Sequence, residues 1–139
     1  EIYDAIQGKL PIAIHCGDYR YEYSHPERLA KIIDNFPKLT IIAAHFGGWS
    51  VWDLALELLE NKIKNSNCYL DTSSSMKFLG KRRTYELIKA YTPEHILFGT
   101  DFPMWTAQQE LDLLNQLPLT AKEQELILAG NANRVLALD

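Results

Sequence analysis

Four polar residues with catalytic potential each follow an apolar run that suits a buried strand. The apolar runs span residues 12–14, 39–44, 68–70 and 96–100. The polar residues that end them are His15, His45, Asp71 and Asp101. An ionisable group at the end of a buried strand is costly unless it is paired or binds a ligand. For a single segment, an aspartate that caps the next loop or a hydrogen-bonded core histidine is the ordinary explanation. The fourfold recurrence favours a shared chemical site.

The spacing of these strand ends is that of a parallel β/α fold. The polar residues lie 30, 26 and 30 positions apart, and each is followed by turn residues and an amphipathic stretch. One strand, one helix and two loops occupy about 30 residues in such folds. The carboxyl ends of parallel strands meet at one edge of the sheet, where these folds carry their chemistry. The sequence therefore predicts an α/β fold with the polar residues at its catalytic face.

His15, His45 and Asp101 together suit a divalent metal ion, Zn²⁺ in the first place, with Mn²⁺ or Fe²⁺ as alternatives. A metal with an open position lowers the pKa of a bound water towards about 7 and polarises a carbonyl. A histidine beside it can move protons, and a carboxylate can bind the metal and accept a proton. These are the parts of a hydrolase. The same parts can polarise a carboxylated substrate for loss of CO₂.

Composition narrows the class of protein. The 139 residues, 47% of them hydrophobic, are enough for one core, so we expect a single domain over 1–139. The net charge of −4, without a basic patch, argues against nucleic-acid binding and leaves a small-molecule substrate. No apolar run reaches the roughly 18 residues of a membrane span. Cys16 and Cys68 have no metal or redox spacing and no secretory signal is visible, so we expect free thiols and a cytoplasmic protein.

The chain divides into four β/α units with further helices at its end. We expect strands at 10–15, 39–44, 68–70 and 96–100. We expect helices at 1–7, 24–36, 50–64, 81–91, 106–117 and 120–130, with a last turn in 131–138. Capping boxes are expected to start three of them, at Ser24, Thr106 and Thr120. A full (β/α)₈ barrel needs roughly 250 residues, so the sequence predicts half of a TIM-type barrel.

Residues 11–18, 36–48, 96–103 and 128–136 form four segments that resemble motifs of the amidohydrolase-related family, which contains aminocarboxymuconate semialdehyde decarboxylase and resorcylate-type decarboxylases. Residues 11–18, with His15, are similar to its fifth-strand segment, and residues 36–48, with His45, to its sixth. Residues 96–103 resemble the eighth-strand GTD-P segment, and residues 128–136, with Asn131 and Arg134, the C-terminal GNA-R-L ending. The resemblance covers nearly the whole chain in the right order and implies strands five to eight of the barrel.

The resemblance also implies roles. His15 would be the fifth-strand metal ligand, and Asp101 the eighth-strand ligand that shares the proton of the metal-bound water. His45 would be the acid/base histidine, or a second-metal ligand as in binuclear relatives. Asn131 and Arg134 match a structural stretch. Asp71 matches a strand end of variable role and is left unassigned.

One feature of the family is missing. Its members carry a His-x-His pair on the first strand, and this chain has neither the pair nor the first four strands. The chain is then either a fragment of a longer enzyme or a half-barrel completed by another molecule. Unpaired strand edges would favour self-association, hence a homo-oligomer. We expect a metal-dependent hydrolase acting on C–N or C–O bonds, with a metal-dependent decarboxylase and a non-catalytic, self-associating half-barrel as alternatives.

Overall fold

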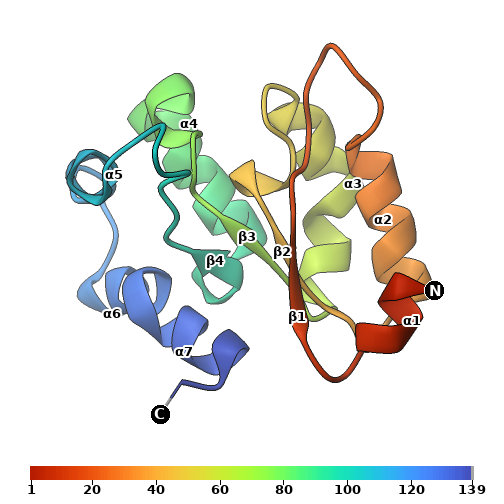
Figure 1. The fold of residues 1–139 in the computed structure, drawn as a ribbon. Helices are drawn as coiled ribbons and strands as arrows, with labels where there is room; N and C mark the ends of the chain where they lie inside the picture. The colour runs from red at the N-terminus through yellow and green to blue at the C-terminus, as the bar shows by residue number, and fades with distance from the viewer. Residues whose placement is uncertain (139) are drawn as a thin grey trace.

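A four-stranded parallel sheet forms the centre of the computed structural model, which describes residues 1–138 (Figure 1). The strands follow one another across the sheet in chain order. They are β1 (Pro11–Ile14), β2 (Thr40–Ala43), β3 (Cys68–Asp71) and β4 (Ile96–Leu97). Ile14 is in register with Ala43, Ala43 with Leu70, and Leu70 with Ile96. The predicted α/β class is confirmed, and the aligned register brings the carboxyl ends of all four strands to one edge.

Helices connect the strands and continue beyond the last one. They are α1 (Ile2–Ile6), α2 (Pro26–Asn35), α3 (Trp52–Lys64), α4 (Met76–Tyr91), α5 (Ala107–Leu114), α6 (Ala121–Glu125) and α7 (Asn131–Leu136), with a π-helical turn at Leu126–Gly130 and 3₁₀ turns at His45–Gly47 and Pro93–His95. In Figure 1, α2 and α3 lie near β1 and β2, whereas α5, α6 and α7 lie beyond β4. No helix within residues 1–138 has both the length and the apolar character needed to cross a membrane.

Helix starts agree with two of the three predicted capping boxes. Oγ1 of Thr106 and of Thr120 accepts the backbone N–H of the third helical residue, and the backbone N–H of each threonine donates to the side chain of that residue in return. The prediction for α2 was wrong by one residue. His25 is the cap there, because its Nδ1 accepts the Glu27 N–H at 3.3 Å, while Ser24 donates its hydroxyl to the Gly17 carbonyl. α4 also starts earlier than predicted, at Met76, and breaks at Gly80, where φ is +69°.

The helices bury one face of the sheet. Ile41, Ala43, Cys68, Leu70 and Ile96 are at most 1% exposed. The core that covers them includes Leu59, Ile63, Leu87, Ile88 and Tyr91. The apolar run over residues 39–44 is typical of a strand buried on both faces. The structure instead shows alternation, with the Thr40 and Ile42 side of β2 half-buried.

β4 is shorter than the predicted strand over 96–100. After Leu97 the Phe98 N–H bonds the carbonyl of Ile127 at 2.9 Å, and the Gly99 N–H bonds Oγ1 of Thr72 at 3.1 Å. A Cβ on Gly99 would lie 3.2 Å from the Cβ atoms of Asp71 and Ser73. The backbone therefore leaves the ladder towards the C-terminal helices and passes close to the end of β3.

Asn131 joins the C-terminal helices to the start of β4. Its fully buried side-chain amide donates to the carbonyls of Pro93 and Ile96, both at 2.7 Å. Replacing it with alanine removes the side-chain donor to the Ile96 carbonyl and leaves the Pro93 carbonyl with the Ile96 N–H alone, and a lost buried donor costs about 1–3 kcal/mol. We expect Asn131→Ala to lower the free energy of unfolding by about 2–3 kcal/mol in urea titrations. Asn133→Ala, at an exposed position two residues on, is the control and should change it by less than about 0.5 kcal/mol.

Glu110 makes the stability depend on pH. Its side chain is 1% exposed, its Oε2 has no hydrogen-bond partner among residues 1–138, and burial raises its pKa to about 7. The folded protein therefore holds a proton that the unfolded chain has lost between about pH 4.5 and pH 7. We expect the free energy of unfolding to fall by up to about 3 kcal/mol as the pH rises through this window. Urea titrations at several pH values in this window should show the fall in the free energy of unfolding for the wild type and not for Glu110→Gln. An equal slope in both proteins would contradict the assignment.

Candidate active site

The strand ends converge on a pocket of about 230 Å³. His15 follows β1, His45 opens the 3₁₀ turn after β2, and Asp101 lies four residues beyond β4. The residues lining the pocket are His15, Asp18, Arg20, His45, Trp49, Ser74, Phe78, Asp101, Met104 and Trp105. The structure thus brings together the three side chains singled out in the sequence.

His15 and His45 contact each other directly. Nδ1 of His15 lies 3.1 Å from Nε2 of His45, and their rings meet edge to face. His45 is buried, at 6% exposure, whereas His15 is exposed at the pocket. Burial and the neighbouring His45 lower the pKa of His15, against the opposing effect of Asp18 and Asp101. A neutral imidazole is the form that binds metal. Because Nδ1 is occupied by His45, Nε2 is the nitrogen of His15 left for a ligand.

Asp101 is held by a chain of two hydrogen bonds. The Ser74 hydroxyl donates to Oδ2 of Asp101 at 2.7 Å, and the Trp105 indole N–H donates to the Ser74 oxygen at 3.0 Å. The carboxylate is therefore oriented by one oxygen, and Oδ1 is left for a ligand or a proton. Orientation of a ligating carboxylate by such outer contacts is typical of metal sites.

Backbone strain gathers at the same pocket. Asp18, His45, Ser74 and Asp101 all have positive φ, at 101°, 61°, 48° and 59°. They are half of the eight non-glycine residues with positive φ that are described in residues 1–138. Such conformations cost about 1–3 kcal/mol each and concentrate where function requires a fixed geometry. Four of these conformations therefore lie around one pocket.

Aromatic side chains form the walls. Phe78 meets Trp49 and Trp105 edge to face, with ring centroids 6.4 and 6.3 Å away. Nζ of Lys77 lies 4.4 Å from the Trp105 ring centroid. The sequence did not identify these residues, because they lie in helices and loops whose periodicity indicates only burial. The pocket combines apolar walls with polar groups from the strand ends.

The loop after β1 contributes the remaining charges and rises beyond the sheet (Figure 1). Arg20 binds Asp18 through two hydrogen bonds of 2.9 and 2.8 Å, and both side chains line the pocket. The loop is tied to the next one by a parallel bridge, in which the Asp18 N–H bonds the Trp49 carbonyl at 2.9 Å and the Trp49 N–H bonds the Cys16 carbonyl at 2.8 Å. Tyr19, Tyr21 and Tyr23 are exposed and line no part of this pocket.

Asp71, which the sequence left unassigned, also lies at the site. Its Oδ1 accepts the backbone N–H groups of His45 and Ser73, each at 3.0 Å, and the Ser73 hydroxyl. The recurrent strand-end pattern was the signal that pointed to it. His95 lies at the other end of the sheet, where its ring bonds the Cys68 carbonyl at 2.8 Å and stacks on Tyr69.

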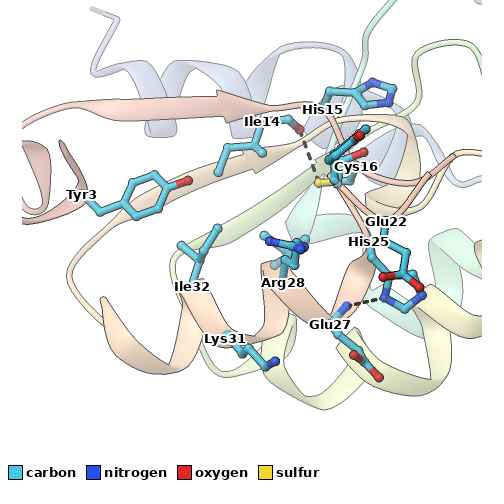
Figure 2. A pocket seen from close by; sticks show the side chains of 13 residues that line it. Tyr3, Ile14, His15, Cys16, Glu22, His25, Glu27, Arg28, Lys31 and Ile32 are labelled. Carbon is cyan, nitrogen blue, oxygen red and sulfur yellow. Dashed lines mark hydrogen bonds between the residues drawn. The ribbon is translucent and has the colours of Figure 1, made fainter. Parts of the chain in front are cut away.

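A second hollow of about 870 Å³ lies between β1 and α2 (Figure 2). Figure 2 shows Tyr3, Ile32 and Arg28 directed into this space, while the His15 ring points away from it. His25 is also there, engaged as the cap of α2. The larger hollow is therefore lined by neither of the strand-end carboxylates, Asp71 and Asp101. The smaller pocket is the one in which Asp101 lies beside His15 and His45, and it is the candidate active site.

The donor set fits part of a metal centre. Within residues 1–138, no group of three or more His, Cys, Asp and Glu side chains is arranged to hold an ion. Catalytic zinc sites ordinarily use three protein ligands. His15 and Asp101 line the same pocket, and each has one atom, Nε2 and Oδ1, outside the hydrogen bonds described above; these are the two donor atoms that the chain could offer to a metal.

Comparison with known proteins identifies the family. The family model described as Amidohydrolase matches residues 5–138. The chain belongs to the amidohydrolase family. No curated protein sequence matched it.

Solved structures place this amidohydrolase-family chain in one half of a barrel. An uncharacterised TIM-barrel protein, Bb4693 from Bordetella bronchiseptica, is 24% identical with a TM-score of 0.77, and the match covers 98% of this chain and 49% of that one. For 5-carboxyvanillate decarboxylase LigW from Sphingomonas paucimobilis, the identity is 16%, the TM-score 0.73 and the coverage 99% and 52%. For amidohydrolase 2 from Bifidobacterium longum subsp. infantis, the identity is 19% and the TM-score 0.71, and the match covers 94% of this chain and 51% of that one. The chain spans about half the length of these proteins, which confirms the predicted half of a TIM barrel.

Proposed function

We propose that this chain supplies the C-terminal half of the active site of a metal-dependent hydrolase that acts on a small molecule. The observation that supports it is the meeting of His15, His45 and Asp101, from three parallel β/α units, at one pocket. His15 and Asp101 are two metal ligands in this proposal. The remaining ligands come from the rest of the complete protein or from another molecule.

The metals of two similar structures support the choice of ion. A dihydroxybenzoic acid decarboxylase from Polaromonas is described with bound manganese; it is 23% identical, with a TM-score of 0.63, and the match covers 81% of this chain and 39% of that one. An amidohydrolase from Burkholderia multivorans is described with bound zinc. It is 16% identical, with a TM-score of 0.61, and the match covers 82% of this chain and 49% of that one. Zn²⁺ suits the imidazole and carboxylate of this chain, with Mn²⁺ and Fe²⁺ as alternatives.

The chain's own residues have distinct tasks in this proposal. A bound divalent cation would make water more acidic and polarise a substrate carbonyl. Asp101 would bind the cation through one carboxylate oxygen and exchange a proton through its carboxylate, which the Ser74 hydroxyl orients at Oδ2. His45 is the second proton-exchanging group, and its ring is fixed between His15 and Ser73. Arg20 offers a guanidinium to an anionic substrate, and the aromatic walls exclude water from a planar one.

A metal-dependent decarboxylase is the second candidate. It is favoured by the aromatic walls together with Arg20, which suit a flat ring that carries a carboxylate. Hydrolysis and decarboxylation use the same metal and carboxylate, and they differ in the bond that breaks.

Product analysis of the complete, metal-loaded protein separates these candidates. We would assay a panel of cyclic and linear esters and amides for hydrolysis, and a panel of aromatic acids for CO₂ release. Turnover of the first panel, lost in His15→Ala and His45→Ala, supports the hydrolase. CO₂ release, lost in the same variants, supports the decarboxylase instead. Activity unchanged in both variants would overturn both proposals and leave the non-catalytic half-barrel.

A further inference from the structure

Ser73 presents two hydrogen-bond acceptors to His45. Nδ1 of His45 lies 2.9 Å from the Ser73 carbonyl oxygen and 2.9 Å from the Ser73 hydroxyl oxygen. A carbonyl oxygen can only accept. The Ser73 hydroxyl has its own proton directed at Oδ1 of Asp71, so it too faces His45 with a lone pair. A neutral His45 bonded to these two oxygens must carry its proton on Nδ1.

The tautomer of His45 determines that of His15. With the proton on Nδ1, Nε2 of His45 is an acceptor. Nδ1 of His15, at 3.1 Å, must then be the donor in their hydrogen bond. A neutral His15 with its proton on Nδ1 has a bare lone pair on Nε2. That is the form in which an imidazole binds a metal through Nε2.

Asp71 is the group that holds this arrangement in place. It accepts both the N–H and the hydroxyl of Ser73, which aims the serine oxygens at the His45 ring. It also accepts the backbone N–H of His45, where φ is +61°. One carboxylate oxygen therefore fixes the backbone of His45 and the partner of its side chain.

We propose that Asp71 is a positioning residue which, through Ser73, locks His45 and then His15 in the tautomers that leave Nε2 of His15 bare for a metal. The inference rests on the proposed function for the identity of that ligand, whereas the tautomers themselves are a property of the metal-free protein. Asp71 acts through other residues and contacts neither metal nor substrate. Loss of such an outer partner typically lowers metal affinity 10–100-fold.

The direct test is ¹⁵N NMR of the complete, metal-free protein labelled at histidine, at a pH where the rings are neutral. The nitrogen shifts show which ring atoms carry protons. We expect protons on Nδ1 of both His15 and His45 in the wild type. In Asp71→Ala, Ser73 loses both bonds that hold its carbonyl and hydroxyl against Nδ1 of His45, and its hydroxyl can turn to donate, so we expect both tautomers of each ring. In Asp71→Asn, the amide oxygen can still accept all three bonds, so the wild-type pattern should return.

Zinc affinity by competition with a chelator is the second readout. We expect a loss of about 10–100-fold in Asp71→Ala and recovery of most of it in Asp71→Asn. Asp34→Asn, an exposed aspartate that binds Lys62, should match the wild type. A folded Asp71→Ala with wild-type nitrogen shifts would overturn the inference. If that variant does not fold, a proton on Nε2 of His45 in the wild type would still overturn it. The expected tautomers in a protein that binds no metal would support the locking role and count against the proposed function alone.

Discussion

His15→Ala is expected to abolish metal binding at the proposed site of the complete protein. His15 is the imidazole whose free nitrogen faces the pocket that it shares with Asp101. Loss of an outer-contact residue costs 10–100-fold in metal affinity, so loss of a ligand should cost more than about 100-fold. Elemental analysis after dialysis should show about one Zn²⁺ or Mn²⁺ less per chain in His15→Ala than in the wild type. Activity of the metal-loaded enzyme should fall in parallel.

His25→Ala is the matched control for this experiment. His25 caps α2 and lies at the hollow of Figure 2, outside the pocket that holds Asp101. Its loss should cost about 1 kcal/mol of stability, as for other helix caps, and should leave the metal content unchanged. Equal metal content in His15→Ala and the wild type would remove His15 from the site.

Alanine at Gly17 should produce the largest loss of stability. A Cβ there would lie 2.1 Å from the backbone nitrogen of Trp49, in a residue whose φ is +100°. The left-handed conformation costs an L-residue about 1–2 kcal/mol, and overpacking adds about 1–3 kcal/mol. We expect Gly17→Ala to lower the free energy of unfolding by about 3 kcal/mol or more in urea titrations. Activity should also fall, because the bridge to Trp49 holds the loop that carries Asp18 and Arg20.

Gly80→Ala separates the two causes. Gly80 also has a positive φ, +69°, but a Cβ there would meet no atom within 4 Å. With ψ at 170° this conformation is one that only glycine adopts readily, so its replacement should cost only the conformational part, about 1–3 kcal/mol. Equal losses in the two variants would mean that the close approach of Gly17 to Trp49 contributes nothing.

The ends of the first three strands were predictable from the sequence to within one residue, because a repeating β/α unit fixes where each strand stops. His15 and Asp101 follow strands whose register is aligned, so their spacing along the chain translates into proximity. The family was predictable for a related reason, since the quoted motifs surround these same residues. The metal, the reaction and the substrate remain predictions.

The contacts around these residues were not predictable, because they depend on how loops turn and not on periodicity. Ser73 and Ser74 are neighbours in one polar run, yet Ser73 holds His45 and Ser74 holds Asp101. The last strand stops at Leu97 because Ile127, far along the chain, takes the next N–H. His25 replaced Ser24 as a helix cap because Ser24 bonds Gly17. Each difference arises from a contact that the local sequence pattern does not reveal.

The most direct test of the proposed site is a crystal structure of the complete protein with diffraction data collected at the absorption edges of zinc and manganese. We predict an anomalous peak within bonding distance of Nε2 of His15 and of the Asp101 carboxylate, about 2.0–2.2 Å for zinc. Other residues of the complete protein would provide the remaining ligands. A peak elsewhere, or none in crystals grown with either metal, would contradict the assignment of His15 and Asp101 as metal ligands.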